Sequence, residues 1–152
     1  MDFHKKMMPI ILLCLYTYTA SAQQSRAEIL WDTYGVPHVF AKNTADMYYG
    51  FGWSQMHNHA NLILQLYAQA RGRSAEYWGE SSFVSDQLMH LLNIPELAKQ
   101  HYEKQDPAFR ACIDAFAEGV NAYAKAHPEA IEEHVKQVLP VTPVDVIAHG
   151  LR

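Results

Sequence analysis

Apolar and polar residues alternate with a helical period over most of the chain after residue 43. Apolar side chains recur three and four positions apart, the spacing that places them on one face of an α-helix. Caps and prolines mark where several of these stretches begin or end. The pattern predicts helices over residues 44–71, 84–92, 95–104, from Pro107 to the boundary set by Pro128, and from Pro143 onward.

The front of the chain has a different character. Residues 27–32 and 38–41 are rich in strand-forming side chains, and residues 34–37 (YGVP) between them have the composition of a turn. Gly35 can adopt a positive φ there without steric cost. Residues 74–80 form a short segment closed by Gly79. The predicted fold class is mostly α with a short N-terminal β-hairpin.

Two apolar helix faces are the predicted core. The first is formed by Leu62, Ile63, Leu66, Tyr67 and Ala70, and the second by Phe109, Cys112, Ile113, Phe116, Val120 and Tyr123. Gly50 and Gly52 are poor helix residues, and each costs roughly 1 kcal/mol relative to alanine. We therefore expect a neighbouring backbone to pack closely against them.

Residues 1–22 differ from the rest of the chain and predict a secretory signal peptide. Lys5 and Lys6 precede a short apolar run, and the sequence Ala-Ser-Ala at 20–22 suits a cleavage site before Gln23. The alternative is a membrane anchor, but the apolar run is about half of the ~20 residues that a spanning helix needs. The mature protein, residues 23–152, is expected to be exported to the periplasm or secreted.

The helix that starts at Thr142–Pro143 reaches Arg152 without a stop signal. This predicts that residues 23–152 are part of a longer polypeptide. A terminal helix that frays is the alternative interpretation. Cleavage before Gln23 would remove Cys14 and leave Cys112, which alone cannot form an internal disulfide.

Composition and spacing argue against several classes of site. The net charge is −4 and no run of Lys or Arg forms a stripe, so nothing favours nucleic acid as a partner. His57 and His59 invite a metal site, but residues two apart on a helix point about 200° apart. A helical zinc pair has i, i+4 spacing. We therefore expect no metal ligands and no cofactor in this chain.

A nucleophilic centre is not indicated by the residues either. Cys112 lies on the apolar face of its predicted helix, which favours core packing over catalysis. None of the serines at 54, 74, 81, 82 and 85 has a G-x-S-x-G context. No catalytic or substrate-binding residue is predicted.

Several blocks along the chain resemble the penicillin acylase family of N-terminal-nucleophile hydrolases, which includes acyl-homoserine-lactone acylases. Residues 34–38 resemble its Y-G-V-P-H, residues 50–59 its G-x-G-Y-A-x-A-Q/R-D-R/N, and residues 70–76 its A-R/Q-G-R-x-A-E, closed by the aromatic-Gly of residues 77–79. Residues 86–94 resemble its D-x-x-x-R-x-L-G-like element, residues 116–123 its A-x-G-V-N-A-Y, and residues 142–146 its T-P-E-D-V. The blocks keep the family's order over residues 27–152.

The chain also departs from the family pattern. Asn58 stands where the family usually has Asp, His57 and His59 flank it, and His90 replaces the usual Arg. These changes put local salt bridges in doubt and indicate a divergent subgroup. The A-R-G form of residues 70–72 looks closer to the homoserine-lactone acylases.

The resemblance implies the α-chain part of an αββα hydrolase that cleaves the amide bond of N-acyl compounds such as penicillins or N-acyl-homoserine lactones. The family precursor cleaves itself into a small α chain and a large β chain, and the catalytic Ser begins the β chain. The implied partners are therefore that β chain and a small N-acyl amide, and this chain alone would be inactive. Some members bind a structural calcium, whose ligands are not identifiable here. The rival hypothesis is a non-catalytic exported helical binding module, or a remnant of a decayed acylase gene.

Overall fold

The computed structural model describes residues 26–152. The signal peptide expected over residues 1–22 lies outside the described residues, and its cleavage stays a prediction. The elements follow in the order β1 Ala27–Trp31, β2 Pro37–Ala41, α1 Thr44–Ala70, α2 Ser74–Trp78, α3 Phe83–Leu91, α4 Ile94–Glu103, α5 Pro107–Ala126, α6 Glu133–Lys136 and α7 Pro143–Leu151. Short 3₁₀ turns occupy Glu80–Ser82 and Pro128–Ala130. The predicted class, mostly helical with an N-terminal hairpin, is confirmed.

The hairpin pairs β1 with β2 in antiparallel register, with Ile29 opposite Val39. Its turn is closed by the side chain of Asp32, which accepts hydrogen bonds from the backbone N–H groups of Tyr34 and Val36 at 2.8 and 2.9 Å. Gly35 has φ +78°, the positive value expected from the sequence. The turn is thus built from local side-chain and backbone chemistry alone.

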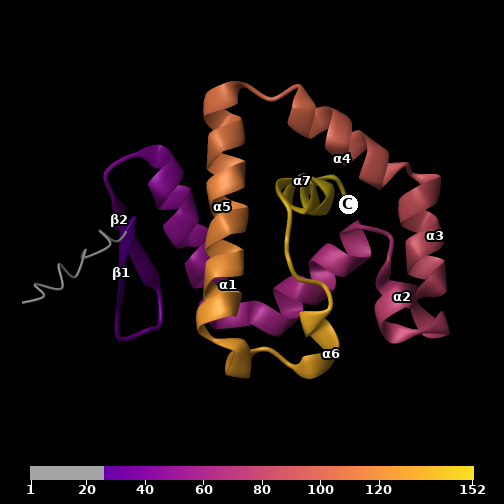
Figure 1. The fold of residues 1–152 in the computed structure, drawn as a ribbon, viewed down its shortest axis with the longest axis horizontal. Coiled ribbons are helices and arrows are strands. Elements are labelled where there is room, and N and C mark those ends of the chain that lie inside the picture. Colours follow the sequence, from indigo (N-terminus) through magenta and orange to yellow (C-terminus); the bar gives the residue numbers. More distant parts are fainter. Residues whose placement is uncertain (1–25) are drawn as a thin grey trace, which may run out of the picture.

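The centre of the molecule is the crossing of α1 and α5 (Figure 1). A Cβ atom at Gly52 would overlap the carbonyl of Phe116, and one at Gly119 would overlap the carbonyl of Tyr49. The prediction of a closely packed backbone is therefore confirmed at Gly52. At Gly50 the neighbour is instead the side chain of Val39, 2.6 Å from the position of a Cβ.

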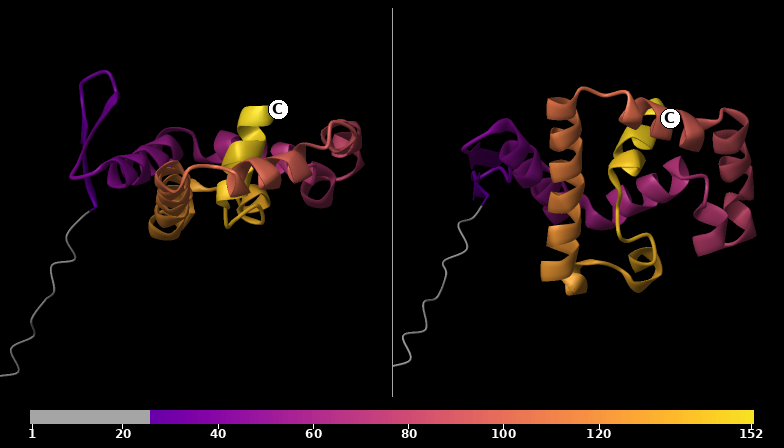
Figure 2. Two further views of the ribbon diagram at one scale, coloured as in Figure 1. Left: turned by 90° about the horizontal axis from the view of Figure 1, so that it is seen from above. Right: turned by 45° about the horizontal axis from the view of Figure 1, so that its top comes forward.

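The other helices surround α7 (Figure 1). Helices α5, α4 and α3 form three sides of a frame, and α7 lies inside it against α4 and α1. Figure 2 shows that the hairpin and α7 both project from the same side of the flat helical layer. The main core joins α1 and α5 to the segment after α5: Met56, Ala60, Leu64, Tyr67, Ala68, Val120, Tyr123, Ala124, Ile131, Val135, Val138 and Val141.

Three details correct the sequence-based expectations. Helix α1 is not straight, because His59 has the non-helical angles φ −143° and ψ 33°. The inward face of its second half contains Leu64 and Ala68, whereas Leu62, expected in the core, is 53% exposed. Phe109 is 44% exposed, although Cys112 is buried as predicted. The short helix α6 was not predicted, because four residues are too few to show the 3.6-residue repeat of apolar positions that indicates a helix.

No helix within residues 26–152 is both long enough and apolar enough to cross a membrane.

Candidate functional site

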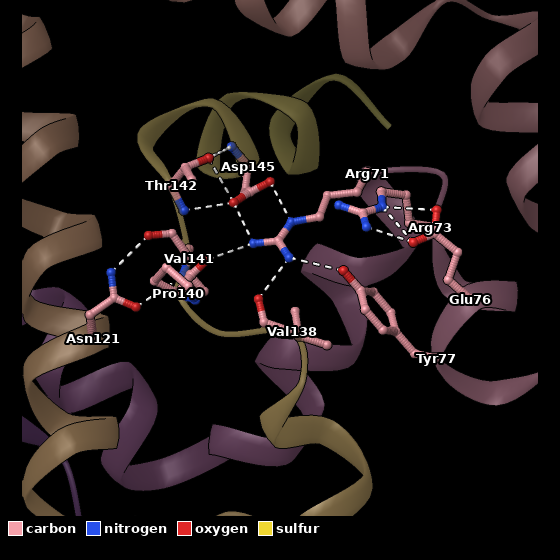
Figure 3. A network of polar contacts seen from close by, with 10 residues as sticks. All are labelled: Arg71, Arg73, Glu76, Tyr77, Asn121, Val138, Pro140, Val141, Thr142 and Asp145. Atoms are coloured by element: carbon pink, nitrogen blue, oxygen red, sulfur yellow. Dashed lines mark hydrogen bonds and ion pairs between the residues drawn. The ribbon is translucent and has the colours of Figure 1, made fainter.

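Arg71 is the centre of the most extensive polar network among the described residues (Figure 3). It follows the last residue of α1, and only 14% of its side chain is exposed. Its Nε and Nη2 atoms donate to the two carboxylate oxygens of Asp145, both at 2.7 Å. This is the bidentate geometry in which an Arg–carboxylate pair is strongest.

The same guanidinium also holds the segment that leads into α7. Nη1 donates to the carbonyl of Val138 at 2.7 Å and Nη2 to that of Pro140 at 2.8 Å. The hydroxyl of Tyr77 accepts a longer bond at 3.3 Å. Arg71 therefore ties the end of α1 to residues 138–145, which are far from it in sequence.

Asp145 has a second role at the start of α7. Its carboxylate accepts hydrogen bonds from the N–H and hydroxyl of Thr142 at 2.6 and 2.7 Å, which completes a capping box. From the other side, Asn121 of α5 donates to the carbonyl of Val141 at 2.7 Å and accepts from its N–H at 2.8 Å. Helix α7 is thus fixed in place from both α1 and α5.

Charge and burial act together in this network. Burial lowers the pKa of Arg71, but the hydrogen bonds and negative charge of Asp145 outweigh it and raise that pKa above its usual value. Burial, with the charge of Asp145, also raises the pKa of the Tyr67 phenol. Arg71 therefore stays a cation and Tyr67 a neutral phenol near neutral pH, which suits a structural clamp.

A long apolar depression opens beside α7, and we call it the apolar groove. It consists of two adjoining clefts of about 260 and 460 Å³, which share the side chains of Phe51, Tyr67, Phe116 and His149. Its walls come from α1, α4, α5 and α7. The other apolar side chains that line it are Leu62, Ile63, Leu66, Phe109, Ile113, Val146, Ile147 and Leu151.

His149 is a half-buried polar residue of the groove, and its Nδ1 atom is fully buried. Its Nδ1 atom has no hydrogen-bond partner, and its ring meets the Tyr67 ring edge-on at a centroid distance of 5.8 Å. Burial, reinforced by the positive charge of Arg152, lowers the pKa of this imidazole. The groove therefore favours the neutral form of this ring.

The described residues do not bring a nucleophile and a base together. The Ser54 hydroxyl donates to the carbonyl of Phe51 at 2.9 Å, and the Ser74 hydroxyl is buried without a partner. Cys112, a residue of α5, is buried. Within residues 26–152 no hydrogen bond joins a histidine to a serine hydroxyl or to this thiol, so no assembled nucleophile can be assigned.

His57 and His59 lie on different surfaces. The ring of His57 stacks between Trp31, at a centroid distance of 4.3 Å, and Trp53, at 5.7 Å. His59 lines the apolar groove beside Leu62. Within residues 26–152 no group of three His, Cys, Asp or Glu side chains could hold a metal ion. The expectation of no metal remains a prediction, and its helical argument fails at His59, where the helix is kinked.

The comparisons with known proteins decide the family. The family model of penicillin amidase matches residues 26–151, which is almost the whole described chain. The chain belongs to the penicillin amidase family.

Relatives and a solved structure agree with this assignment. An acyl-homoserine lactone acylase PvdQ of Pseudomonas savastanoi pv. phaseolicola is 28% identical over 120 residues, covering 74% of this chain and 15% of that protein. Penicillin G acylase of Escherichia coli is 24% identical over 125 residues, covering 79% and 15%. A thermostable penicillin G acylase from Alcaligenes faecalis shares the fold with a TM-score of 0.71 at 24% identity, covering 82% of this chain and 70% of that one. The chain thus spans about 15% of the length of these two relatives.

The blocks that resemble the penicillin amidase family contain the residues through which the helices contact one another. Arg71, Asn121 and Asp145 come from three different blocks, and together they hold α7. Gly52 and Gly119 come from two blocks and meet at the helix crossing. The sequence reveals each block, but it does not indicate which blocks contact one another in the fold. The one available signal was the presence of Arg71 in one block and of the oppositely charged Asp145 in another.

The residues that depart from the family pattern form contacts with nearby groups. The Nε2 atom of His90 lies 3.0 Å from the carbonyl of Gly72, whose φ is +65°. Asn58 contributes Oδ1 at 3.2 Å from Nδ1 of the neighbouring His57. Within residues 26–152, these hydrogen-bond contacts are what His90 and Asn58 make, and neither residue takes part in an ion pair.

Proposed function

We propose that this chain is the α-chain part of an exported amidohydrolase that cleaves the amide bond of N-acyl compounds such as penicillins or N-acyl-homoserine lactones. The observation that carries the proposal is the match of the penicillin amidase family over residues 26–151. The names of the relatives supply the two substrate classes, acyl-homoserine lactones and penicillin G.

In this proposal the reacting groups belong to the β chain of the same precursor. Its N-terminal Ser attacks the carbonyl carbon of the amide, with its own α-amino group as the base. The α-chain part positions that catalytic half and contributes no reacting atom. This division of roles agrees with the lack of a joined nucleophile and base among residues 26–152.

The apolar groove supports the proposal of a larger partner. Phe51 is 45% exposed and Leu62 is 53% exposed, and both line the groove. Apolar surface that stays open in an exported protein marks an interaction site. We propose that the β chain covers this groove in the mature enzyme.

The test compares two proteins, residues 23–152 alone and the product of the complete reading frame. Each is assayed for release of free amine from penicillin G and from long-chain N-acyl-homoserine lactones. We expect turnover only from the complete product, after it has cleaved itself into two chains. Turnover by residues 23–152 alone would contradict the proposal, and a complete product that neither matures nor hydrolyses would favour the binding-module alternative.

Export and metal content are proposals with their own readouts. The mature protein recovered from the periplasm or medium should begin at Gln23 by N-terminal sequencing, and a protein that begins at Met1 would contradict export. We also propose that this portion needs no metal or cofactor. Zinc retained in a 1:1 ratio after dialysis, and lost when His57 and His59 are both changed to Ala, would show the reverse.

A further inference from the structure

Helix α3 presents apolar side chains to solvent along one side. Val84, Leu88 and Leu91 follow the i, i+4, i+7 spacing that places them on one face of a helix. Leu91 is 83% exposed and Val84 is 74% exposed, whereas Met89 on the opposite side of α3 is buried. We call this surface the α3 face, and it consists of Phe83, Val84, Leu88, Leu91 and Leu92. The apolar stripe of α3 thus points away from the core.

A cleft lies beside the α3 face. It has a volume of about 820 Å³ and lies between α3, α2 and the loop at Gly72. The ionisable groups that line it already have partners. Asp86 accepts hydrogen bonds from two backbone N–H groups at the start of α2, at 2.9 and 2.7 Å, and Nε2 of His90 lies 3.0 Å from the carbonyl of Gly72. Glu76 pairs with Arg73 at 2.6 Å, so the cleft suits an uncharged, apolar occupant.

The α3 face is separate from the apolar groove. Figure 1 shows α3 at the end of the molecule opposite the hairpin. None of the side chains that line the groove comes from α3. The partner proposed for the groove therefore does not account for this second apolar surface.

The charges around the α3 face restrict the class of partner. Residues 81–95 contain no Lys, Arg or Glu, and their one acid, Asp86, is buried. The flanking charged residues are Glu80 and Glu96. Helices that bind lipid surfaces carry Lys and Arg on their polar side, and anionic lipids would repel these flanking acids. The face instead fits an apolar, uncharged protein surface, and the same face of a second copy is such a surface.

The area of the α3 face is sufficient for a pair. A large, fully exposed apolar side chain presents roughly 150–200 Å², so the exposed fractions of the five residues leave roughly 500 Å² on each copy. Two copies would together bury about 1,000 Å², which is the size at which a specific interface begins. Interfaces of this size are weak, so we expect a dissociation constant in the micromolar range.

We propose that two copies of this protein pair through their α3 faces, antiparallel about a twofold axis that passes near Leu88. In this arrangement the N-terminus of each helix lies beside the C-terminus of the other, which the helix dipoles favour. Val84 of one copy then lies beside Leu91 of its partner. Gln87, the polar residue at the centre of the helix, can bond the same residue across the axis, because its amide both donates and accepts. The pair goes beyond the proposed function, since it involves no step of amide hydrolysis.

The first experiment measures the mass of the complete product by sedimentation from about 1 to about 200 μM, which spans a micromolar dissociation constant. Leu91→Glu places a charge inside the pair and should raise that constant at least about tenfold. Lys99→Gln makes the same change in net charge on the exposed surface of α4 and should leave it unchanged. A product that stays monomeric throughout would overturn the proposal, as would equal effects of the two variants.

The second experiment tests the orientation and separates a lost contact from a misfolded variant. One protein carries Leu91→Glu and the other Val84→Lys, so an antiparallel pair brings the two opposite charges together. Each variant alone should dimerise weakly. An equimolar mixture should dimerise at least about tenfold more tightly than either variant alone, because opposite charges attract and like or single charges do not. A mixture no tighter than its components would overturn the antiparallel pair.

Other occupants of the α3 face give different results. If the proposed β chain covers it, the complete product stays monomeric and Leu91→Glu lowers the yield of self-cleaved protein. If a lipid surface covers it, a monomer sediments with vesicles of phosphatidylcholine and phosphatidylglycerol. Either result overturns the second copy. A dimer that hydrolyses no N-acyl amide would support the pair and count against the proposed function, whereas an active monomer would do the reverse.

Discussion

The polar network around α7 differs from the hairpin and the apolar groove in how fully its side chains find partners within residues 26–152. Around α7, Arg71 is largely buried, Asp145 is buried, and the guanidinium of Arg71 donates five hydrogen bonds. At the hairpin and the apolar groove, Leu30, Phe40 and Leu62 stay about half exposed. One region satisfies its polar groups within residues 26–152, and the other leaves apolar surface exposed, which at the groove we propose further polypeptide covers. The following changes test that contrast.

The largest effect is expected at Arg71. Arg71→Ala leaves the buried carboxylate of Asp145 without its partner, and removal of one member of a buried pair costs about 3–5 kcal/mol. Arg71→Lys should restore only part of this, because an ammonium cannot form the bidentate fork. The free energy of unfolding from urea titration measures both changes.

Arg73→Ala is the matched control for that prediction. Arg73 makes a comparable ion pair with Glu76 at 2.6 Å, but both side chains are about half exposed. Surface pairs contribute at most about 1 kcal/mol. A loss of stability at Arg73 equal to that at Arg71 would show that burial does not distinguish the two pairs.

The two leucines of α1 sharpen the contrast between a finished and an unfinished surface. Leu64 is fully buried, so Leu64→Ala should cost about 2–5 kcal/mol of unfolding free energy with or without the β chain. Leu62→Ala should change the unfolding free energy of residues 23–152 by less than about 0.5 kcal/mol, and lower that of the complete product by more if the proposed β chain covers the groove. Urea titrations of both forms give the comparison, and an equal cost of Leu62→Ala in the two forms would argue against a covered groove.

An intermediate effect is expected at the helix crossing. Gly52→Ala adds a Cβ atom where the carbonyl of Phe116 already lies, and such overpacking costs about 1–3 kcal/mol. Gly150→Ala is the control, because nothing lies within 4 Å of its added atom and alanine favours the helix. The thermal midpoint should fall for the first variant and stay or rise for the second.

The smallest effect is a pH dependence from His149. Its pKa is lowered in the folded protein, so the unfolded chain binds the proton more readily. The contribution of His149 to stability is therefore complete above its ordinary pKa of about 6.5 and is lost as the pH falls through the lower, folded value. His149→Gln should make the urea midpoint less sensitive between pH 8 and pH 5. An unchanged slope would assign the acid sensitivity to other groups.

The sequence alone could predict the features that depend on neighbouring residues. Thr142 and Asp145 form the expected helix start, and Asp106 caps α5 by accepting from the N–H of Ala108 at 2.8 Å. The same reasoning could not show that the carboxylate of Asp145 also binds Arg71, which precedes it by 74 positions. Such a pair depends on tertiary packing, for which a single sequence carries no distance information.

The error at Leu62 has a physical cause of the same kind. Five of the nine buried positions of α1 recur every four residues, at Gly52, Met56, Ala60, Leu64 and Ala68. In a helix with 3.6 residues per turn this line advances by about 40° at each step. The buried line therefore winds around α1, which is also kinked at His59. The stripe drawn through Leu62 and Leu66 assumed one straight face.

The glycine crossing has a consequence for how this chain can change over evolutionary time. Gly52 faces the carbonyl of Phe116 on the other helix, and Gly119 faces that of Tyr49 in return, so the two positions share one gap. A first alanine at either site forces the helices apart, and a second alanine then enters space that has already opened. The two costs should therefore not add. As long as both glycines are present, replacement of either one is costly. Once one has been replaced, replacement of the other should cost less stability.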